Sequence, residues 1–220
     1  MNKEDIQNNI ERYNERFKNF GYSPRTLGWG KVKQDIRFDV LTSSYNCSDK
    51  TILDIGCGFG DLNKTLSKKF QNYNYIGCDL CKNLIEEGKK HFPNSKFYIG
   101  DFLTLDINEN IDWAVASGTF NHIFEHGDNY EFIKDVMIKT FDMVNDGFAF
   151  DFISDKVDYK DEHLFYSSPE KILSYAYELS RNVILRSDYV PFEFSLIVFK
   201  DDSFDKDDKI FRKYKNDKNI

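Results

Sequence analysis

The strongest indication of the fold is the stretch TILDIGCGFGD, residues 51–61. Its first five residues are mostly apolar and predict a buried strand. Glycines follow at positions 56, 58 and 60, and residues 61–70 have the apolar spacing of a helix. Glycine allows the chain to turn sharply and lets a ligand lie against bare backbone. The stretch therefore predicts a ligand-binding turn between a strand and a helix.

The spacing of these glycines is G-x-G-x-G, which differs from the G-x-G-x-x-G typical of dinucleotide-binding folds. Asp54 precedes the turn and Asp61 follows it. A helix N-terminus that binds a diphosphate favours negative charge on the ligand, not on the protein. Acidic residues on both sides of the turn therefore favour a cationic ligand over a diphosphate.

Two further aspartates end the next two predicted strands, 73–79 and 96–101. Asp79 is placed to accept hydrogen bonds from ribose hydroxyls. Asp101 is placed to reach an adenine amino group, with Phe102 covering the ring. Because parallel strands end at one edge of a sheet, we expect these residues to lie in the same crevice as the glycine turn.

The rest of the chain predicts a Rossmann-like α/β fold: a seven-stranded, mostly parallel sheet with helices on both faces and an antiparallel C-terminal strand. A helical cap is expected over residues 1–46, the sheet domain over 47–200 and a charged tail over 201–220. The expected strands are 51–56, 73–79, 96–101, 111–117, 147–154, 182–190 and 192–200. The expected helices are 3–20, 31–45, 61–70, 82–91, 129–143 and 170–180.

Composition limits the partners of this 220-residue chain. Its formal net charge of −7 argues against a protein that follows a phosphate backbone. There is no apolar run of the roughly 20 residues needed to span a bilayer, and the charged N-terminus does not resemble a secretory signal. We therefore expect a cytoplasmic protein without membrane or nucleic-acid partners; the oligomeric state is open. The four cysteines are expected to be reduced thiols in the core.

The motifs resemble those of the class I S-adenosylmethionine-dependent methyltransferases over about residues 50–155. ILDIGCGFG, IGCDL, YIGDF and IDWAVASGTFN match the family's first four motifs in order. The resemblance implies S-adenosylmethionine as cofactor and S-adenosylhomocysteine as product. It also implies that the glycine turn holds the methionine part, Asp79 the ribose, and Asp101 with Phe102 the adenine. The predicted cofactor-binding residues are Asp54, Gly56, Cys57, Gly58, Gly60, Asp79, Leu80, Asp101, Phe102, Ser117 and Gly118.

The methyl acceptor is expected beside residues 117–126, which leave the fourth strand and are rich in polar groups. His122 and His126 share one face if this segment is a helical turn, and either is a candidate general base. Asn121 is a third candidate catalytic residue. A metal site would need a further ligand such as Glu125 or His163, and no metal site is predicted.

Aromatic side chains before and after the sheet are expected to complete the acceptor pocket. The predicted substrate-binding residues are Tyr13, Tyr22, Trp29, His163 and Tyr166. Arg25 and Lys31 are candidate ligands for an anionic acceptor or for the carboxylate of the cofactor. The segments SPRTLGWGK and LFYSSPEKIL resemble a bacterial subgroup that acts on small molecules. The acceptor is therefore expected to be a small hydroxylated or anionic metabolite, such as a sugar or another cell-surface precursor.

Two other functions fit a similar sheet. An NAD-linked oxidoreductase would require a G-x-G-x-x-G turn, which this chain lacks. A non-catalytic domain that only binds S-adenosylmethionine would not need the polar segment 117–126. Protein or RNA methylation is less favoured because no basic stripe is present.

Overall fold

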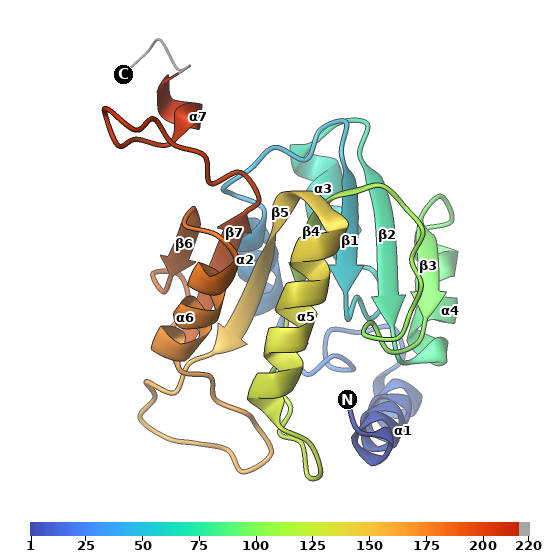
Figure 1. The fold of residues 1–220 in the computed structure, drawn as a ribbon. Coiled ribbons are helices and arrows are strands. Elements are labelled where there is room, and N and C mark those ends of the chain that lie inside the picture. The colour runs from blue at the N-terminus through green and yellow to red at the C-terminus, as the bar shows by residue number, and fades with distance from the viewer. Residues whose placement is uncertain (216–220) are drawn as a thin grey trace.

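The computed structural model describes residues 1–215 and contains a seven-stranded sheet (Figure 1). The strand order is β3-β2-β1-β4-β5-β7-β6. The first five strands pair in parallel, whereas β7 runs antiparallel between β5 and β6. The strands are β1 (Thr51–Ile55), β2 (Asn74–Asp79), β3 (Lys96–Ile99), β4 (Ile111–Ala116), β5 (Val144–Ile153), β6 (Val183–Arg186) and β7 (Glu193–Phe199). The predicted Rossmann-like fold is confirmed.

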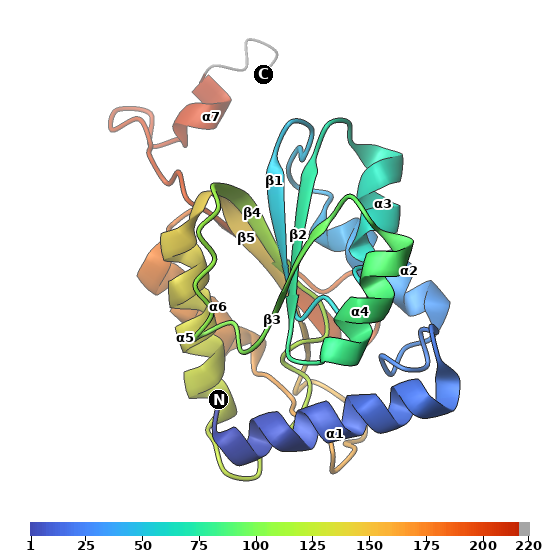
Figure 2. The same cartoon turned by 90° about the vertical axis from the view of Figure 1, so that its right-hand side faces the viewer.

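Helices cover both faces of the sheet (Figure 2). One face carries α2 (Lys31–Leu41), α3 (Leu62–Lys69) and α4 (Lys82–His91). The other carries α5 (Asn129–Met143) and α6 (Pro169–Leu179). The long helix α1 (Lys3–Phe20) crosses below the carboxyl ends of the parallel strands, and the short α7 (Arg212–Lys215) lies near the opposite end of the molecule. No helix of the described residues is long and apolar enough to cross a membrane.

The core explains why the central strands are apolar on both faces. Phe148, Phe150 and Phe152 are buried on β5, and Phe194 is buried on β7. The ring of Phe152 stacks on those of Phe120 and Phe194, with both pairs of centroids 5.1 Å apart. Since helices seal both sides, water reaches neither face at these positions. Ligand access is therefore limited to the strand ends.

Several predicted boundaries are wrong by a few residues. The strand expected over 182–190 ends at Arg186, and the strand expected over 96–101 ends at Ile99. The helix expected over 31–45 ends at Leu41, where the side chain of Thr42 donates a hydrogen bond to the Phe38 carbonyl and the chain leaves helical geometry. The fifth strand starts at Val144, before the expected residue 147, because the chain passes directly from α5 into β5. Of the predicted tail, residues 201–215 hold a bridge between Phe204 and Phe211, and 216–220 lie outside the described residues.

Candidate functional site

The glycine turn after β1 is held by backbone hydrogen bonds to the end of β2. The N–H groups of Gly56 and Cys57 both donate to the Cys78 carbonyl, at 2.8 and 3.0 Å. Gly58 has a φ of +54°, a conformation that side chains other than glycine's disfavour. A Cβ there would also lie 2.8 Å from Cδ2 of Leu27. Glycine is therefore required at position 58 by both backbone geometry and close packing.

Asp79 connects the glycine turn to the start of α4. Its carboxylate accepts the N–H of Gly58 at 2.8 Å and the N–H of Cys81 at 2.8 Å. Burial raises the pKa of Asp79, and the two backbone hydrogen bonds partly offset this rise. A carboxylate oxygen can accept more than one hydrogen bond, so Asp79 retains capacity for a ligand hydroxyl.

Asp54 is the most buried acid of the turn. It lies on β1 and accepts a hydrogen bond from the Tyr75 hydroxyl at 2.7 Å. Burial raises its pKa to about 7, although the Tyr75 hydrogen bond opposes the rise. Nearby charges on Asp79 and Asp61 add to the increase. A cation bound beside Asp54 would therefore favour its ionised form.

Asp101 and Phe102 follow β3 at the same edge. The Asp101 carboxylate accepts the N–H of Leu103 at 3.1 Å, and the nitrogen of Met1 lies 3.6 Å from its other oxygen. The Phe102 ring is buried, with Nζ of Lys139 at 5.0 Å from its centroid. A buried carboxylate beside an aromatic ring matches the chemistry of an adenine site.

The end of β4 is fixed by Asp151 of the neighbouring strand β5. Its carboxylate accepts the Ser117 hydroxyl at 2.5 Å and the Gly118 N–H at 2.7 Å. Trp29, in the loop between α1 and α2, contacts Gly118 so closely that no Cβ would fit there. The loop before α2 therefore packs directly on the segment where the acceptor is expected.

One cavity of about 1150 Å³, including its open mouth, joins these parts. It brings together ten of the eleven predicted cofactor-binding residues, and Tyr13, Trp29 and His122 also line it. The ten are Asp54, Gly56, Cys57, Gly58, Asp79, Leu80, Asp101, Phe102, Ser117 and Gly118. Gly60 is outside the lining, since the space beside its Cα is filled by the Phe97 ring.

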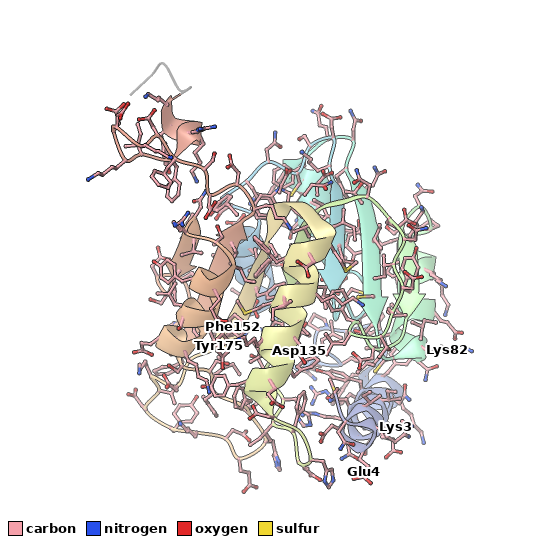
Figure 3. The ribbon with its side chains drawn as sticks, in the orientation of Figure 1. Lys3, Glu4, Lys82, Asp135, Phe152 and Tyr175 are labelled. Carbon is pink, nitrogen blue, oxygen red and sulfur yellow. The ribbon has the colours of Figure 1, made fainter. Side chains whose placement is uncertain are left out.

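The two candidate histidines are not on one helical face, because residues 121–128 form no helix. His122 lines the cavity, and its Nδ1 accepts a hydrogen bond from Arg12 at 2.6 Å. Burial and the Arg12 charge lower the pKa of His122, while a hydrogen bond to the His163 backbone raises it in part. His126 lies outside the lining, 46% exposed, with its Nε2 3.1 Å from Glu4, a residue of α1 labelled in Figure 3.

Other predicted residues also lie outside the cavity lining. The Tyr22 hydroxyl donates to Asp61 at 2.7 Å, on the outer side of the glycine turn. Asn121 is buried, and its side chain accepts the N–H of Ile153. The side chain of His163 is 74% exposed, and the Tyr166 hydroxyl accepts the N–H of Asp161 within the same loop.

Gln34 and Arg37, two buried polar residues of α2, also line the cavity and were not predicted from the sequence. They share a helical face with the buried Phe38 and Leu41, at the i, i+3, i+4 and i+7 positions. Polar residues at these otherwise apolar helix positions were the sequence signal that could have identified Gln34 and Arg37. Arg25 and Lys31, the predicted anion ligands, are exposed and do not line the cavity.

Within residues 1–215, no group of three His, Cys, Asp or Glu side chains is arranged to hold a metal ion. The four cysteines, Cys47, Cys57, Cys78 and Cys81, are buried thiols. Burial raises the pKa of each. Cys78 and Cys81, which are spaced as C-x-x-C, are thus part of the packing around the cavity.

Comparison with known proteins agrees with this geometry. Residues 52–138 match the family model described as a methyltransferase domain. A malonyl-[acyl-carrier protein] O-methyltransferase of Priestia megaterium is 32% identical over 82 residues, which are 36% of this chain and 30% of that protein. The chain thus spans less than a third of that relative's length.

Solved structures share the fold at low sequence identity. Magnesium protoporphyrin IX methyltransferase of Synechocystis, with bound S-adenosylhomocysteine, superposes with a TM-score of 0.63 at 12% identity, covering 89% of this chain and 99% of that one. DhpI in complex with S-adenosylhomocysteine superposes with a TM-score of 0.65 at 14% identity. The match covers 90% of this chain and 97% of DhpI. Residues 52–138 therefore match a methyltransferase domain, and the chain shares its fold with solved structures of S-adenosylmethionine-dependent methyltransferases.

Proposed function

We propose that this chain transfers the methyl group of S-adenosylmethionine to a small hydroxylated or anionic metabolite, with sugars and other cell-surface precursors among the candidates. The main support is the single cavity that joins the glycine turn to the end of β4. The net charge of −7 favours a small acceptor over nucleic acid.

The residues of the cavity fit this cofactor. Asp54, Asp79 and Asp101 all line it, and burial raises the pKa of the first two. A ligand with a sulfonium and an ammonium group would stabilise their charged forms. We assign the glycine turn and Asp54 to the methionine part, Asp79 to the ribose, and Asp101 with Phe102 to the adenine.

When bound, S-adenosylmethionine supplies an activated methyl group together with its own leaving group. The protein then has to align the acceptor and exclude water. Helix α1 serves the second purpose, because Asn9 and Tyr13 from this helix line the cavity. Its Arg12 also occupies the lone pair of His122 Nδ1, so we assign His122 to positioning rather than to proton removal.

Calorimetry with S-adenosylmethionine, S-adenosylhomocysteine and NAD tests the cofactor assignment. We expect binding of the first two and none of NAD. Asp79→Ala should weaken S-adenosylhomocysteine binding about 10-fold or more, because it removes a charged hydrogen-bond acceptor. Asp135→Asn, on the exposed side of α5, is the matched control. Binding of NAD alone, or unchanged affinity of Asp79→Ala, would contradict the assignment.

Transfer is tested separately, with cofactor labelled at the methyl group and a set of sugar nucleotides and small hydroxy acids as acceptors. We expect label in at least one acceptor. Cofactor binding without any transfer would favour a non-catalytic binding domain.

A further inference from the structure

Helix α2 presents a polar wall to the end of the cavity away from the adenine site. Gln34 and Arg37 are one helical turn apart, line the cavity and are only 7% and 2% exposed. Buried charged side chains need partners, because burial without them is costly. The hydrogen-bond partners of these two side chains, and the donors left without one, therefore indicate which ligand group the wall can bind.

Arg37 is held rigidly from two sides. Its Nε and Nη2 donate to the two carboxylate oxygens of Glu193, at 2.6 and 2.5 Å. The guanidinium also lies over the Trp29 ring, 3.7 Å from its centroid. Such a bidentate pair fixes the plane of the guanidinium. The remaining nitrogen, Nη1, therefore points away from Glu193 in a defined direction.

Nη1 of Arg37 is buried and has no hydrogen-bond partner among the described residues. An unsatisfied buried donor is destabilising, and more so when the group is charged. The side-chain amide of Gln34 makes no hydrogen bond within residues 1–215 either. The wall thus offers donors that the protein itself leaves unused.

The carboxylates near the wall are already engaged. Glu193 accepts two hydrogen bonds from Arg37, and Lys33 lies 3.9 Å from it. Asp151 accepts those of Ser117 and Gly118. Neither side chain lines the cavity. An incoming group therefore meets donors on this wall rather than competing acceptors.

The wall is next to the expected site of methyl transfer. The Trp29 ring lies against the Arg37 guanidinium and also contacts Gly118, so it connects α2 to the end of β4. A small molecule bound at the end of β4 would thus lie within reach of α2. The cofactor part of the cavity, around Asp79 and Asp101, is formed by other elements.

We propose that Arg37 and Gln34 bind a carboxylate group of the methyl acceptor. This inference rests on the proposed function and narrows its substrate class. A carboxylate offers oxygens to both donors at once. The charges of Arg37 and Glu193 balance, and the carboxylate of Asp151 is also close enough to act on Arg37. The wall therefore supplies directed hydrogen bonds without the excess positive charge that a dianionic phosphate would require.

Calorimetry on protein saturated with S-adenosylhomocysteine tests the inference. The probes are 4-hydroxybenzoate and 3-hydroxybutyrate, each compared with its amide and its phosphonate counterpart. We expect at least one carboxylate to bind about 10-fold or more tightly than its amide, as for a charge-assisted hydrogen bond. The phosphonate should bind no more tightly than the carboxylate.

Variants assign this preference to the wall. Gln34→Leu keeps the ion pair intact and should weaken carboxylate binding. Arg37→Met combined with Glu193→Leu removes both charges without leaving one buried alone, and should abolish the preference for the carboxylate. Arg181→Gln, an exposed arginine paired with Asp202, is the control and should change nothing.

The inference is overturned if carboxylates and amides bind equally, or if neither carboxylate probe binds. It is also overturned if the preference for the carboxylate persists in the double variant. Tightest binding of the phosphonates would also overturn it. Failure of the protein to bind S-adenosylhomocysteine is a different result, since it would remove the proposed function itself. The two failures are therefore distinguishable.

Discussion

Asp54 shows how one residue links ligand binding to stability. It is buried beneath the glycine turn with the Tyr75 hydroxyl as its hydrogen-bond donor. Burial raises its pKa to about 7 from a usual value of 3.8. Between these two values the folded protein binds more protons than the unfolded chain. The stability of the protein therefore falls as pH rises from about 4 to 7.

We predict that Asp54→Asn makes thermal stability less dependent on pH. The variant cannot ionise, so its melting temperature should exceed that of the natural protein at pH 8 and approach it at pH 5. Melting curves across this range provide the measurement. A variant that is less stable at pH 8 would show that the ionised carboxylate stabilises the fold.

The same residue predicts a pH dependence of cofactor binding. A cationic ligand prefers the ionised form of Asp54, so affinity should rise with pH up to about 7 and then level off. Calorimetry with S-adenosylmethionine, which carries the sulfonium, at pH 6, 7 and 8 checks this for the natural protein. In Asp54→Asn the affinity should be lower and nearly constant. A pH profile identical in both proteins would exclude Asp54 as its source.

That the candidate cofactor residues lie together could be predicted from the sequence, because they follow strands in a fixed order. Asp54, Asp79 and Asp101 each stand at or near the end of a strand, and parallel pairing brings such ends together. Arg37 was not predicted, because its partner Glu193 is 156 residues away. No local pattern reports a pairing between a helix and a distant strand.

Among the elements, the loop of residues 21–30 connects two turns of the site. Leu27 packs on Gly58 and Trp29 packs on Gly118. The side chain of Arg16 anchors the loop, donating a hydrogen bond to the Thr26 carbonyl at 2.8 Å. The aromatic residues of this loop, Tyr22 and Trp29, were expected in the acceptor pocket, and of the two only Trp29 lines the cavity. The contacts of the loop with two glycines depend on tertiary structure alone.

We predict that Gly58→Ala destabilises the protein by more than about 1 kcal/mol, because φ is positive and Leu27 is too close. Leu27→Ala in the same chain should recover the steric part and leave the conformational part. Urea unfolding of the two single variants and the double variant gives the coupling energy. If the free-energy changes of the two single variants simply add in the double variant, steric contact with Leu27 does not contribute to the destabilisation.

The segment 121–128 is a case where local pattern misled. The spacing of His122 and His126 is helical, yet α5 begins only at Asn129. Asp5 of α1 instead accepts the N–H of Glu125 at 2.9 Å, and Asn129 accepts that of Phe124 at 3.0 Å. Side chains from elsewhere thus satisfy the donors that a helical turn would have used.

For the molecule as a whole, α1 is the element that covers the strand ends. It is tied to the segment after β4 by Asp5 and by the hydrogen bond from Arg12 to His122. Its middle contributes Asn9 and Tyr13 to the cavity. The stability of these ties therefore determines how readily the cavity opens.

We predict that Arg12→Met raises the pKa of His122 and loosens α1. Removing the guanidinium removes a nearby positive charge that lowers this pKa. Nuclear magnetic resonance titration of the ring gives the pKa, and hydrogen exchange over residues 3–20 reports the opening of the helix. Lys18→Met, an exposed cation of the same helix, is the comparison. Equal behaviour of the two variants would show that Arg12 does not hold α1.

The reversed direction of β7 sets an order of assembly. Because β7 runs antiparallel to β5, its first residue, Glu193, is the one that reaches the ligand edge and meets Arg37. The cofactor residues from Asp54 to Phe102 emerge from the ribosome much earlier. We therefore expect that, during synthesis, the candidate nucleoside half of the crevice can form before the guanidinium of Arg37 meets its counterion. A nascent chain halted before residue 193 is expected to contain the nucleoside half of the crevice but to lack the ion pair between Arg37 and Glu193.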